Sequence, residues 1–267
     1  MGPEEIGRAD VPSEARAELE ALVGALTETV RDDLVGVYVH GSVALGCFNA
    51  ARSDVDVIAV VREPLSDEQR LRLVDALLRI SAAPHGIELH VVTRTTLETW
   101  EHPARFELHY SETLRERFAF DPVETLARLP ATDADLAAHM TVARAVGIAL
   151  TGPPAAELFP KVPRADLVDS LLRDLEWTRT APSALYGVLS PCRVWATLET
   201  GAVHSKLTGA RWALEQLPPD LGAPVERALA SYAGAGDPIE LAEDERARLW
   251  AYIGERVRSI AVSNAAT

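Results

Sequence analysis

The stretch of sequence that decides the fold covers residues 38–61 and reads YVHGSVALGCFNAARSDVDVIAVV. It contains two β-branched runs, one that stops at Gly41-Ser42 and one that covers residues 55–61, and both are expected to be strands. Side chains alternate between the faces of a strand, so Asp54 and Asp56 are expected on the same face. Two carboxylates that close are stabilised by a cation, and their hard oxygen atoms favour Mg²⁺. The stretch therefore predicts a magnesium site at the start of the second strand.

Two neighbouring features point to phosphate chemistry at the same place. Gly41-Ser42 follows the first strand directly, where a glycine lets the backbone approach a phosphate and the Ser42 hydroxyl can donate a hydrogen bond to it. Glu88 is a polar exception in an otherwise apolar run, 87–93, which is expected to be a third strand. This strand could lie beside the second one and add a third carboxylate to the same face.

The rest of the chain divides into an α/β part and a helical part. Helical spacing of apolar residues over 13–34 and 68–80 joins the three strands in a small mixed α/β unit. From Thr95 onward no β pattern remains, and helices are expected over the segments 104–118, 133–150, 164–177, 184–199, 204–217, 223–234 and 240–262. The Gly-Pro-Pro run at 152–154 predicts a boundary between a domain of residues 1–154 and a helical bundle of residues 155–267.

Composition excludes several classes of partner. The chain has 267 residues, 48% of them hydrophobic, with 26 Lys and Arg against 40 Asp and Glu, so its formal net charge is −14. This excess of negative charge argues against nucleic-acid binding and suits a cationic small molecule. No apolar run reaches about 18 residues, and the acidic N-terminus lacks the basic start of a signal peptide. We therefore expect a cytoplasmic monomer that binds neither membranes nor nucleic acid.

The seven histidines show no metal-ligand spacing. His40 is expected to pack beside the site because it precedes Gly41, and the other six are expected to have ordinary core or surface roles.

Motifs in both halves of the chain resemble one known family. His40-Gly41-Ser42, Gly46 and Ser53-Asp54-Val55-Asp56 resemble the signature of the antibiotic-modifying branch of the nucleotidyltransferase β superfamily. The helical half is similar to that of the AadA-type aminoglycoside (streptomycin and spectinomycin) adenylyltransferases in the segments 189–195, 200–201, 205–206 and 211–218. The resemblance extends over roughly residues 15–255. It implies a nucleotidyltransferase domain, a mixed sheet with helices, followed by a C-terminal helical bundle.

The same resemblance implies roles for individual residues. Metal binding and catalysis fall to Asp54, Asp56 and Glu88, the last also as catalytic base. The residues that would contact ATP are Gly41, Ser42, Ser53, Asp135, Lys206 and Tyr232. Apart from the resemblance, the acceptor is expected to contact the carboxylates of Glu88 and Glu112 and to stack on Trp177.

The implied reaction moves AMP from Mg-ATP to a hydroxyl of an aminoglycoside or aminocyclitol and releases pyrophosphate. Two Mg²⁺ ions about 3.5–4 Å apart would stabilise the attacking and leaving oxygens at the α-phosphorus. Glu88 would accept the hydroxyl proton, and Lys206 would offset the charge that builds on pyrophosphate.

The acceptor-binding positions depart from the family pattern. Enzymes that modify both streptomycin and spectinomycin have a tryptophan after a Gly-Glu pair, whereas here Glu112 is followed by Thr113. Trp177 is joined to Arg193 by a shorter segment, which resembles the branch that acts only on spectinomycin, although Ser183 stands where an acidic residue is expected. A spectinomycin-like acceptor is therefore favoured. The alternatives are nucleotidyl transfer to another small metabolite or a protein hydroxyl, and a non-catalytic nucleotide-binding relative.

Overall fold

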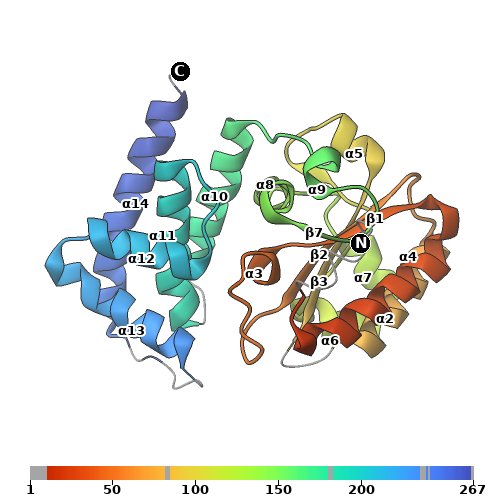
Figure 1. The fold of residues 1–267 in the computed structure, drawn as a ribbon, viewed down its shortest axis with the longest axis horizontal. Coiled ribbons are helices and arrows are strands. Elements are labelled where there is room, and N and C mark those ends of the chain that lie inside the picture. Colours follow the sequence, from red (N-terminus) through yellow and green to blue (C-terminus); the bar gives the residue numbers. More distant parts are fainter. Residues whose placement is uncertain (1–10, 82–84, 180–182, 235–238, 240, 266–267) are drawn as a thin grey trace, which may run out of the picture. The chain divides into compact units, whose positions relative to one another are not determined.

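The computed structural model describes residues 11–81, 85–179, 183–234, 239 and 241–265 (Figure 1). The chain divides into two compact units, Met1–Val162 and Pro163–Thr267. The domain boundary after Pro154 stays a prediction. Phe159, which follows Pro154 in the chain, packs inside the first unit, and its ring lies edge to face with that of Tyr38 at a centroid distance of 5.0 Å.

The first unit contains a mixed sheet with helices. Its strands are β1 (Leu34–Val39), β2 (Val55–Val61), β3 (Ile87–Thr93), β4 (Ala104–Arg105), β5 (Leu108–Tyr110), β6 (Thr132–Asp133) and β7 (Ile148–Thr151). Its helices are α2 (Ser13–Val30), α3 (Gly41–Ala44), α4 (Asp67–Ile80), α5 (Arg94–Glu98), α6 (Arg115–Phe120), α7 (Pro122–Arg128), α8 (Leu136–Val146) and α9 (Ala155–Leu158), with the short 3-10 helices η1 (Arg31–Asp33) and η2 (Glu112–Leu114).

The main sheet has the strand order β5-β3-β2-β1-β7. β2 and β3 are parallel because the chain crosses over through α4 between them, and the other pairs in this sheet are antiparallel. The parallel register places Asp56 beside Glu88, and the antiparallel register of β3 and β5 places His90 beside His109. The strand that carries Glu88 therefore neighbours the strand that carries Asp56.

The two faces of the sheet pack against different helices. Val57 and Ala59 of β2 belong to the same core cluster as apolar residues of α2 and α4, whereas Ile58 and Val60 pack with residues of α8 and α9. Figure 1 shows α2 and α4 on one side of the strands and α8 and α9 on the other. Because side chains alternate along a strand, even-numbered residues of β2 and β3 face α8. The polar residues at the start of these two strands thus lie on the α8 face.

Two expectations about secondary structure are wrong. Strands continue after Thr95, and the segment 104–118 is not one helix but contains β4, β5 and η2 before α6 begins. The helix expected over 133–150 ends at Val146, and β7 follows it. β5 and β7 are only three and four residues long and are formed by pairing with β3 and β1 at the edges of the sheet, which no local pattern reveals.

The second unit is helical, as predicted. Its helices are α10 (Arg164–Thr178), α11 (Ala184–Thr200), α12 (Lys206–Gln216), α13 (Gly222–Ala233) and α14 (Glu243–Ala265), with η3 (Pro219–Leu221) between α12 and α13. α11 and α12 approach closely at Gly209, where an added Cβ would lie 2.6 Å from the Arg193 Cα. In the part of the chain that the structure describes, no helix has both the length and the apolar character of a membrane span.

Candidate active site

The turn after β1 is built around Gly41. Gly41 has a φ of +58°, and a Cβ at this position would lie 1.8 Å from Asp56 Oδ2. The His40 backbone N–H donates a hydrogen bond of 2.9 Å to the Asp56 carbonyl oxygen, which fixes the end of β1 against the start of β2. The side chain of Asp56 is therefore held against the Gly41-Ser42 turn.

The two serines predicted to contact ATP lie at either end of the loop between β1 and β2. Ser42 Oγ is buried and has no hydrogen-bond partner among the described residues. Ser53 is 7% exposed, and its hydroxyl accepts a hydrogen bond of 3.1 Å from the Asn49 N–H. The Ser53 hydroxyl thus stabilises the loop by a hydrogen bond within it. The Ser42 hydroxyl makes no such bond among the described residues.

Asp54 lies just before β2 and next to the start of β3. A Cβ added to Gly86 would lie 2.9 Å from Asp54 Oδ1 and 2.4 Å from Glu112 Cγ, so Asp54 and Glu112 both lie against Gly86. The Val55 N–H donates a 2.7 Å hydrogen bond to the Gly86 carbonyl, which joins the two strand starts. The predicted metal-binding carboxylates Asp54, Asp56 and Glu88 are thus placed at the beginning of two adjacent parallel strands.

Four histidines, at positions 40, 90, 109 and 139, surround Glu88, and the spacing of histidines along the chain does not predict this cluster. His90 of β3 stacks on His109 of β5 with ring centroids 4.1 Å apart, and His139 of α8 lies 5.5 Å from His90 and 5.0 Å from His40. The His109 Nε2 atom is 3.6 Å from Glu88 Oε1. These residues come from separate segments of the chain, so only the fold brings them together. The one local signal was His90 itself, a second polar side chain in the apolar run of β3.

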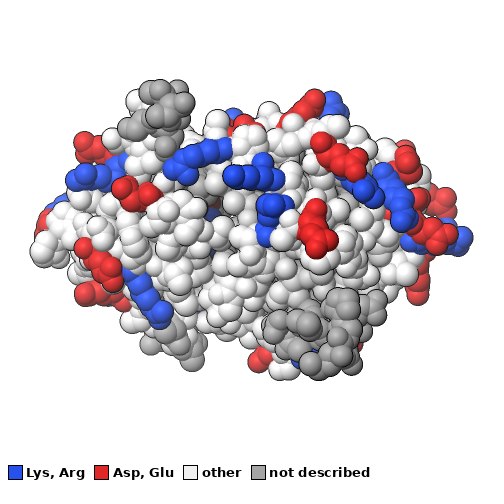
Figure 2. All heavy atoms as spheres, turned by 45° about the horizontal axis from the view of Figure 1, so that its top comes forward, with Lys and Arg blue, Asp and Glu red and all other residues white. Residues whose placement is uncertain are grey.

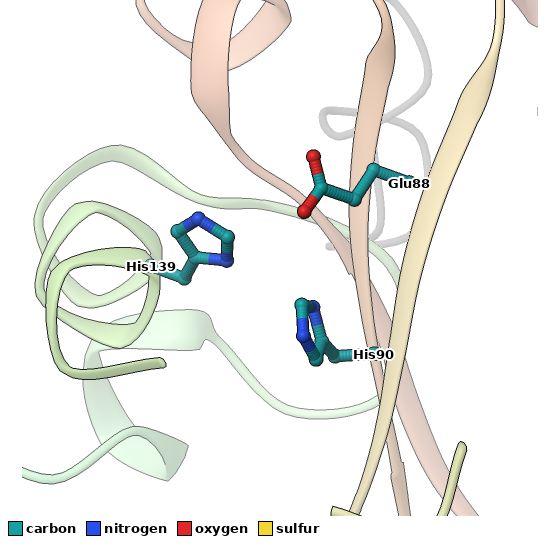
Figure 3. A group of neighbouring side chains, drawn as sticks. All are labelled: Glu88, His90 and His139. Carbon is teal, nitrogen blue, oxygen red and sulfur yellow. The ribbon is translucent and has the colours of Figure 1, made fainter. Parts of the chain in front are cut away.

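Among the described residues, two overlapping groups have ligand atoms within 4.8 Å of one another, as a single metal ion would require. They are Glu88 with His90 and His139, and His90 with His109 and Asp133. Asp54 and Asp56 are in neither group. Figure 3 shows the side chains of Glu88, His90 and His139 directed toward a common space between β3 and α8.

The surroundings lower the pKa values of four groups in this cluster. Burial would raise the pKa of Glu88, but the surrounding imidazoles, His109 above all, lower it below its usual range. Burial lowers the pKa of His90 to about 4, against the opposing effect of its hydrogen bond to Asp133, and lowers that of His40 well below its usual value. Burial would also raise the pKa of Asp133, but the hydrogen bond with His90 brings it to about 2. At neutral pH, Glu88 and Asp133 are therefore ionised, and His40 and His90 are uncharged.

Glu112 and Asp135 have identifiable partners in the first unit. The Glu112 carboxylate accepts hydrogen bonds from the Ser81 hydroxyl and, at 3.3 Å, from the Tyr110 hydroxyl. Asp135 is exposed just before α8, and its backbone N–H donates a 2.9 Å hydrogen bond to Asp133 Oδ1. Glu112 thus joins β5 to the end of α4, and Asp135 begins the helix that carries His139.

The predicted residues of the second unit form one small cluster and one separate position. Lys206 begins α12, and its Nζ atom lies over the Tyr186 ring, 3.5 Å from the centroid. Tyr186 also meets Trp177 edge to face at 5.9 Å, and Trp177 is 53% exposed. Tyr232 lies apart from these residues in the chain, half-buried on α13.

The excess of acidic residues does not form a continuous acidic area on the face drawn in Figure 2, where acidic and basic side chains are interspersed. Several acidic side chains are paired with arginine within their own unit, for example Glu107 with Arg70 at 2.7 Å and Asp174 with Arg193 at 2.5 Å. The net charge is therefore distributed, and no acidic patch on this face marks a site for a cationic molecule.

A Gly-Ser turn after one strand, an Asp-x-Asp at the next and a glutamate on a third, parallel strand form the arrangement that the resemblance to the nucleotidyltransferases predicts. In agreement, residues 20–112 match the family described as nucleotidyltransferase domain, and residues 157–256 match the family described as aminoglycoside adenylyltransferase, C-terminal domain.

Complete relatives resemble both units. An aminoglycoside (3'')(9) adenylyltransferase from Escherichia coli is 31% identical over 238 residues, which cover 85% of this chain and 88% of that protein. A spectinomycin 9-adenylyltransferase from Staphylococcus aureus is 31% identical over 214 residues, 76% of this chain and 80% of that protein. The chain belongs to the aminoglycoside adenylyltransferase family, and the protein is an enzyme of this nucleotidyltransferase type.

The fold is shared with a solved relative. The crystal structure of a spectinomycin adenyltransferase from Enterococcus faecialis, determined with ATP and spectinomycin, matches with a TM-score of 0.78 and 22% sequence identity. The match covers 91% of this chain and 98% of the other. The predicted fold class, a nucleotidyltransferase domain followed by a helical bundle, is confirmed.

Proposed function

We propose that the protein transfers AMP from Mg-ATP to a hydroxyl of an aminocyclitol antibiotic of the spectinomycin type and releases pyrophosphate, and that it thereby confers resistance. The observation that carries the proposal is the register of β2 and β3, which places Asp56 beside Glu88 at the Gly41-Ser42 turn in a chain of this family. The names of the relatives and the ATP and spectinomycin in the solved relative support the choice of substrates.

The carboxylates of Asp54, Asp56 and Glu88 fit magnesium by their chemistry. All three offer hard oxygen atoms at the start of adjacent strands, and Asp56 Oδ2 lies where any side chain at position 41 would displace it. When bound, Mg²⁺ would neutralise phosphate charge and stabilise the attacking and leaving oxygens. We include two ions in the proposal, held by these three residues.

Ser42 is proposed to bind a phosphate of ATP. Its Oγ is a buried hydroxyl without a partner in the described part of the chain, and an unsatisfied buried polar atom costs about 1–3 kcal/mol. A phosphate oxygen at the Gly41 turn would accept this hydrogen bond, since a glycine leaves the backbone accessible. Ser53, Asp135 and Tyr232 are proposed as further ATP contacts because they match the family pattern.

Glu88 is proposed as the base that accepts the proton of the acceptor hydroxyl. The lowered pKa of Glu88 keeps the carboxylate ionised at neutral pH, so that it can accept a proton, and also makes it a weaker base than an ordinary glutamate. Lys206 is proposed to place its charge on the leaving pyrophosphate. Its Nζ atom lies over the Tyr186 ring on the same unit, 3.5 Å from the ring centroid, and this contact orients the ammonium group.

The acceptor is proposed to contact Glu88, Glu112 and Trp177. Trp177 is a large aromatic side chain that is half exposed, and aromatic faces bind the cationic groups and apolar ring faces of such molecules. Glu112 lies beside Asp54 at Gly86 and would add negative charge next to the carboxylates.

A panel of acceptors tests the proposal. Purified protein with Mg-ATP is expected to release pyrophosphate with spectinomycin and to remain at background without an acceptor. Streptomycin is the comparison compound, since the short segment after Trp177 predicts a preference of at least about tenfold in kcat/KM for spectinomycin, or about 1.4 kcal/mol. Background rates with both antibiotics, and activity with another small molecule or a protein hydroxyl, would contradict the proposed acceptor.

A further inference from the structure

The space between β3 and α8 is lined by metal-binding groups, and two of them, His90 and His139, have no part in the proposed reaction. Glu88 and His90 extend from the same face of β3, and His139 faces them from α8 (Figure 3). Their three ligand atoms all lie within 4.8 Å of one another. Around a tetrahedral zinc ion with bonds of about 2.0–2.1 Å the ligand atoms are roughly 3.4 Å apart, so side-chain movements of about 1 Å would complete the geometry.

A hydrogen bond to Asp133 orients His90 for metal binding. The His90 Nε2 atom lies 3.1 Å from Asp133 Oδ2, so the ionised carboxylate accepts a hydrogen bond from Nε2–H. The lone pair of His90 is then on Nδ1, which is buried and has no hydrogen-bond partner among the described residues. Metal-binding histidines are commonly fixed in this way by a carboxylate on their other nitrogen.

A nitrogen of His139 also lacks a hydrogen-bond partner. His139 Nδ1 is buried without a hydrogen-bond partner in the described part of the chain. The His90 side chain is only 1% exposed, so water has little access to its face of the cluster. Buried polar atoms are normally paired, so these two imidazole nitrogens beside the Glu88 carboxylate fit a bound metal ion, which accepts electron pairs.

The chemistry of the donors selects the kind of ion. Two imidazoles and one carboxylate suit Zn²⁺ and its neighbours Co²⁺ and Ni²⁺, whereas Mg²⁺ prefers oxygen ligands only. We propose that Glu88, His90 and His139 form a binding site for a transition-metal ion of the zinc class. Asp133 acts as the positioning residue of this site.

Because the proposed metal site includes Glu88, metal binding there would affect AMP transfer. A zinc ion on Glu88 occupies the oxygen atoms that bind Mg²⁺ and accept the substrate proton, so the transition metal inhibits AMP transfer. This consequence rests on the proposed function, whereas metal binding itself does not.

Cobalt binding tests the site without ATP, magnesium or acceptor. Full-length protein, first freed of metal with a chelator, is titrated with Co²⁺ and followed by its visible absorption. One equivalent is expected to produce the intense bands of a four- or five-coordinate Co²⁺ site, and Zn²⁺ is expected to remove them. A spectrum no different from that of Co²⁺ in buffer would overturn the proposal.

Variants assign the ligands. His139→Gln and His139→Leu each remove one ligand and are expected to weaken Co²⁺ binding at least about 100-fold, and Asp133→Asn about 10–100-fold. His204→Gln is the matched control, because His204 lies in the second unit and bonds with Thr200 at 3.0 Å. Circular dichroism confirms that each variant is folded. Unchanged Co²⁺ binding in both folded His139 variants, or its loss in His204→Gln, would show that the ion binds elsewhere.

Inhibition is measured separately, as the zinc concentration that halves the rate of each protein relative to its own rate without zinc. This concentration is expected to rise at least tenfold in His139→Gln and to stay the same in His204→Gln. Equal zinc sensitivity in the two variants would overturn the inhibitory role. If the protein has no transferase activity, the cobalt titration still decides whether the site exists, so the two proposals fail separately.

Discussion

Gly41 has a left-handed backbone and leaves no room for a side chain beside Asp56. Gly46 has a similar φ of +66°, but nothing lies within 4 Å of the position a Cβ would take. Both positions therefore need a residue that tolerates a positive φ. Only position 41 also needs a residue without a side chain. At this scale the sequence predicts Asp54, Asp56 and the Gly-Ser turn, since they lie in one short stretch.

Gly41→Ala is expected to lower AMP transfer at least about 100-fold, because the new methyl group displaces the Asp56 carboxylate by more than an ångström. Gly46→Ala is the matched control. Both changes are expected to cost about 1–2 kcal/mol of stability through the left-handed backbone. Pyrophosphate release and urea unfolding measure the two effects. Equal activity in both variants would show that the position of Asp56 does not matter.

The histidine cluster predicts a dependence of stability on pH. Burial lowers the pKa of His90 from 6.5 to about 4, so between these values the unfolded chain binds a proton that the folded chain does not. The free energy of unfolding should therefore fall by about 3 kcal/mol as the pH decreases from about 6.5 to about 4. Asp133 acts at lower pH, since its stabilising effect is present above its ordinary pKa of 3.8 and is lost as the pH falls toward about 2.

Urea unfolding between pH 7 and pH 4, with a chelator present, measures this dependence. His90→Gln is expected to reduce the slope without abolishing it, because burial also lowers the pKa of His40. An identical slope in His90→Gln would mean that His90 does not titrate differently in the folded and unfolded chain.

At the scale of elements, pairing and packing decide what the local pattern leaves open. β2 and β3 are long β-branched strands that periodicity identifies, whereas β5 and β7 are recognisable only once β3 and β1 are there to pair with them. The same reason hides the histidine cluster, because His109 lies on β5 and His139 on α8. The helices of the second unit are long and amphipathic, so they follow the predicted segments to within a few residues.

Alanine is expected to have opposite effects at two helical glycines, one at the contact of α11 with α12 and one on the exposed side of α2. Gly209→Ala would place a Cβ 2.6 Å from the Arg193 backbone, and it is expected to destabilise the protein by about 1–3 kcal/mol. Gly24→Ala lies on the exposed side of α2 with no atom within 4 Å of the new Cβ, and it is expected to stabilise by about 0.5–1 kcal/mol. Thermal unfolding measures both, and a stabilising Gly209→Ala would contradict the close helix contact.

For the whole molecule, motifs in both units predict the fold class and the family, and the matches confirm both. The net charge of −14 predicts less, because many acidic side chains are paired with arginine and both signs are interspersed on the face shown in Figure 2. The proposed reaction draws its residues from both units, with the carboxylates on the first and Lys206 on the second.

Lys206 tests whether the second unit takes part in the chemistry. Lys206→Met is expected to lower kcat/KM at least about 100-fold, because a positioned charge at a leaving phosphate is worth roughly 3 kcal/mol or more. Lys161→Met, an exposed lysine of the first unit, is the control and is expected to change kcat/KM less than twofold. Similar kinetics of the two variants would remove Lys206 from the proposed mechanism.

AMP transfer to spectinomycin is measured most directly as the mass of spectinomycin after incubation with Mg-ATP and the protein. The unmodified protein is expected to increase this mass by one adenylyl group. Glu88→Gln is expected to do so at a rate at least about 100-fold lower, in a protein that circular dichroism shows to be folded. Spectinomycin that keeps its mass, or adenylylation at an undiminished rate by Glu88→Gln, would contradict the proposed reaction.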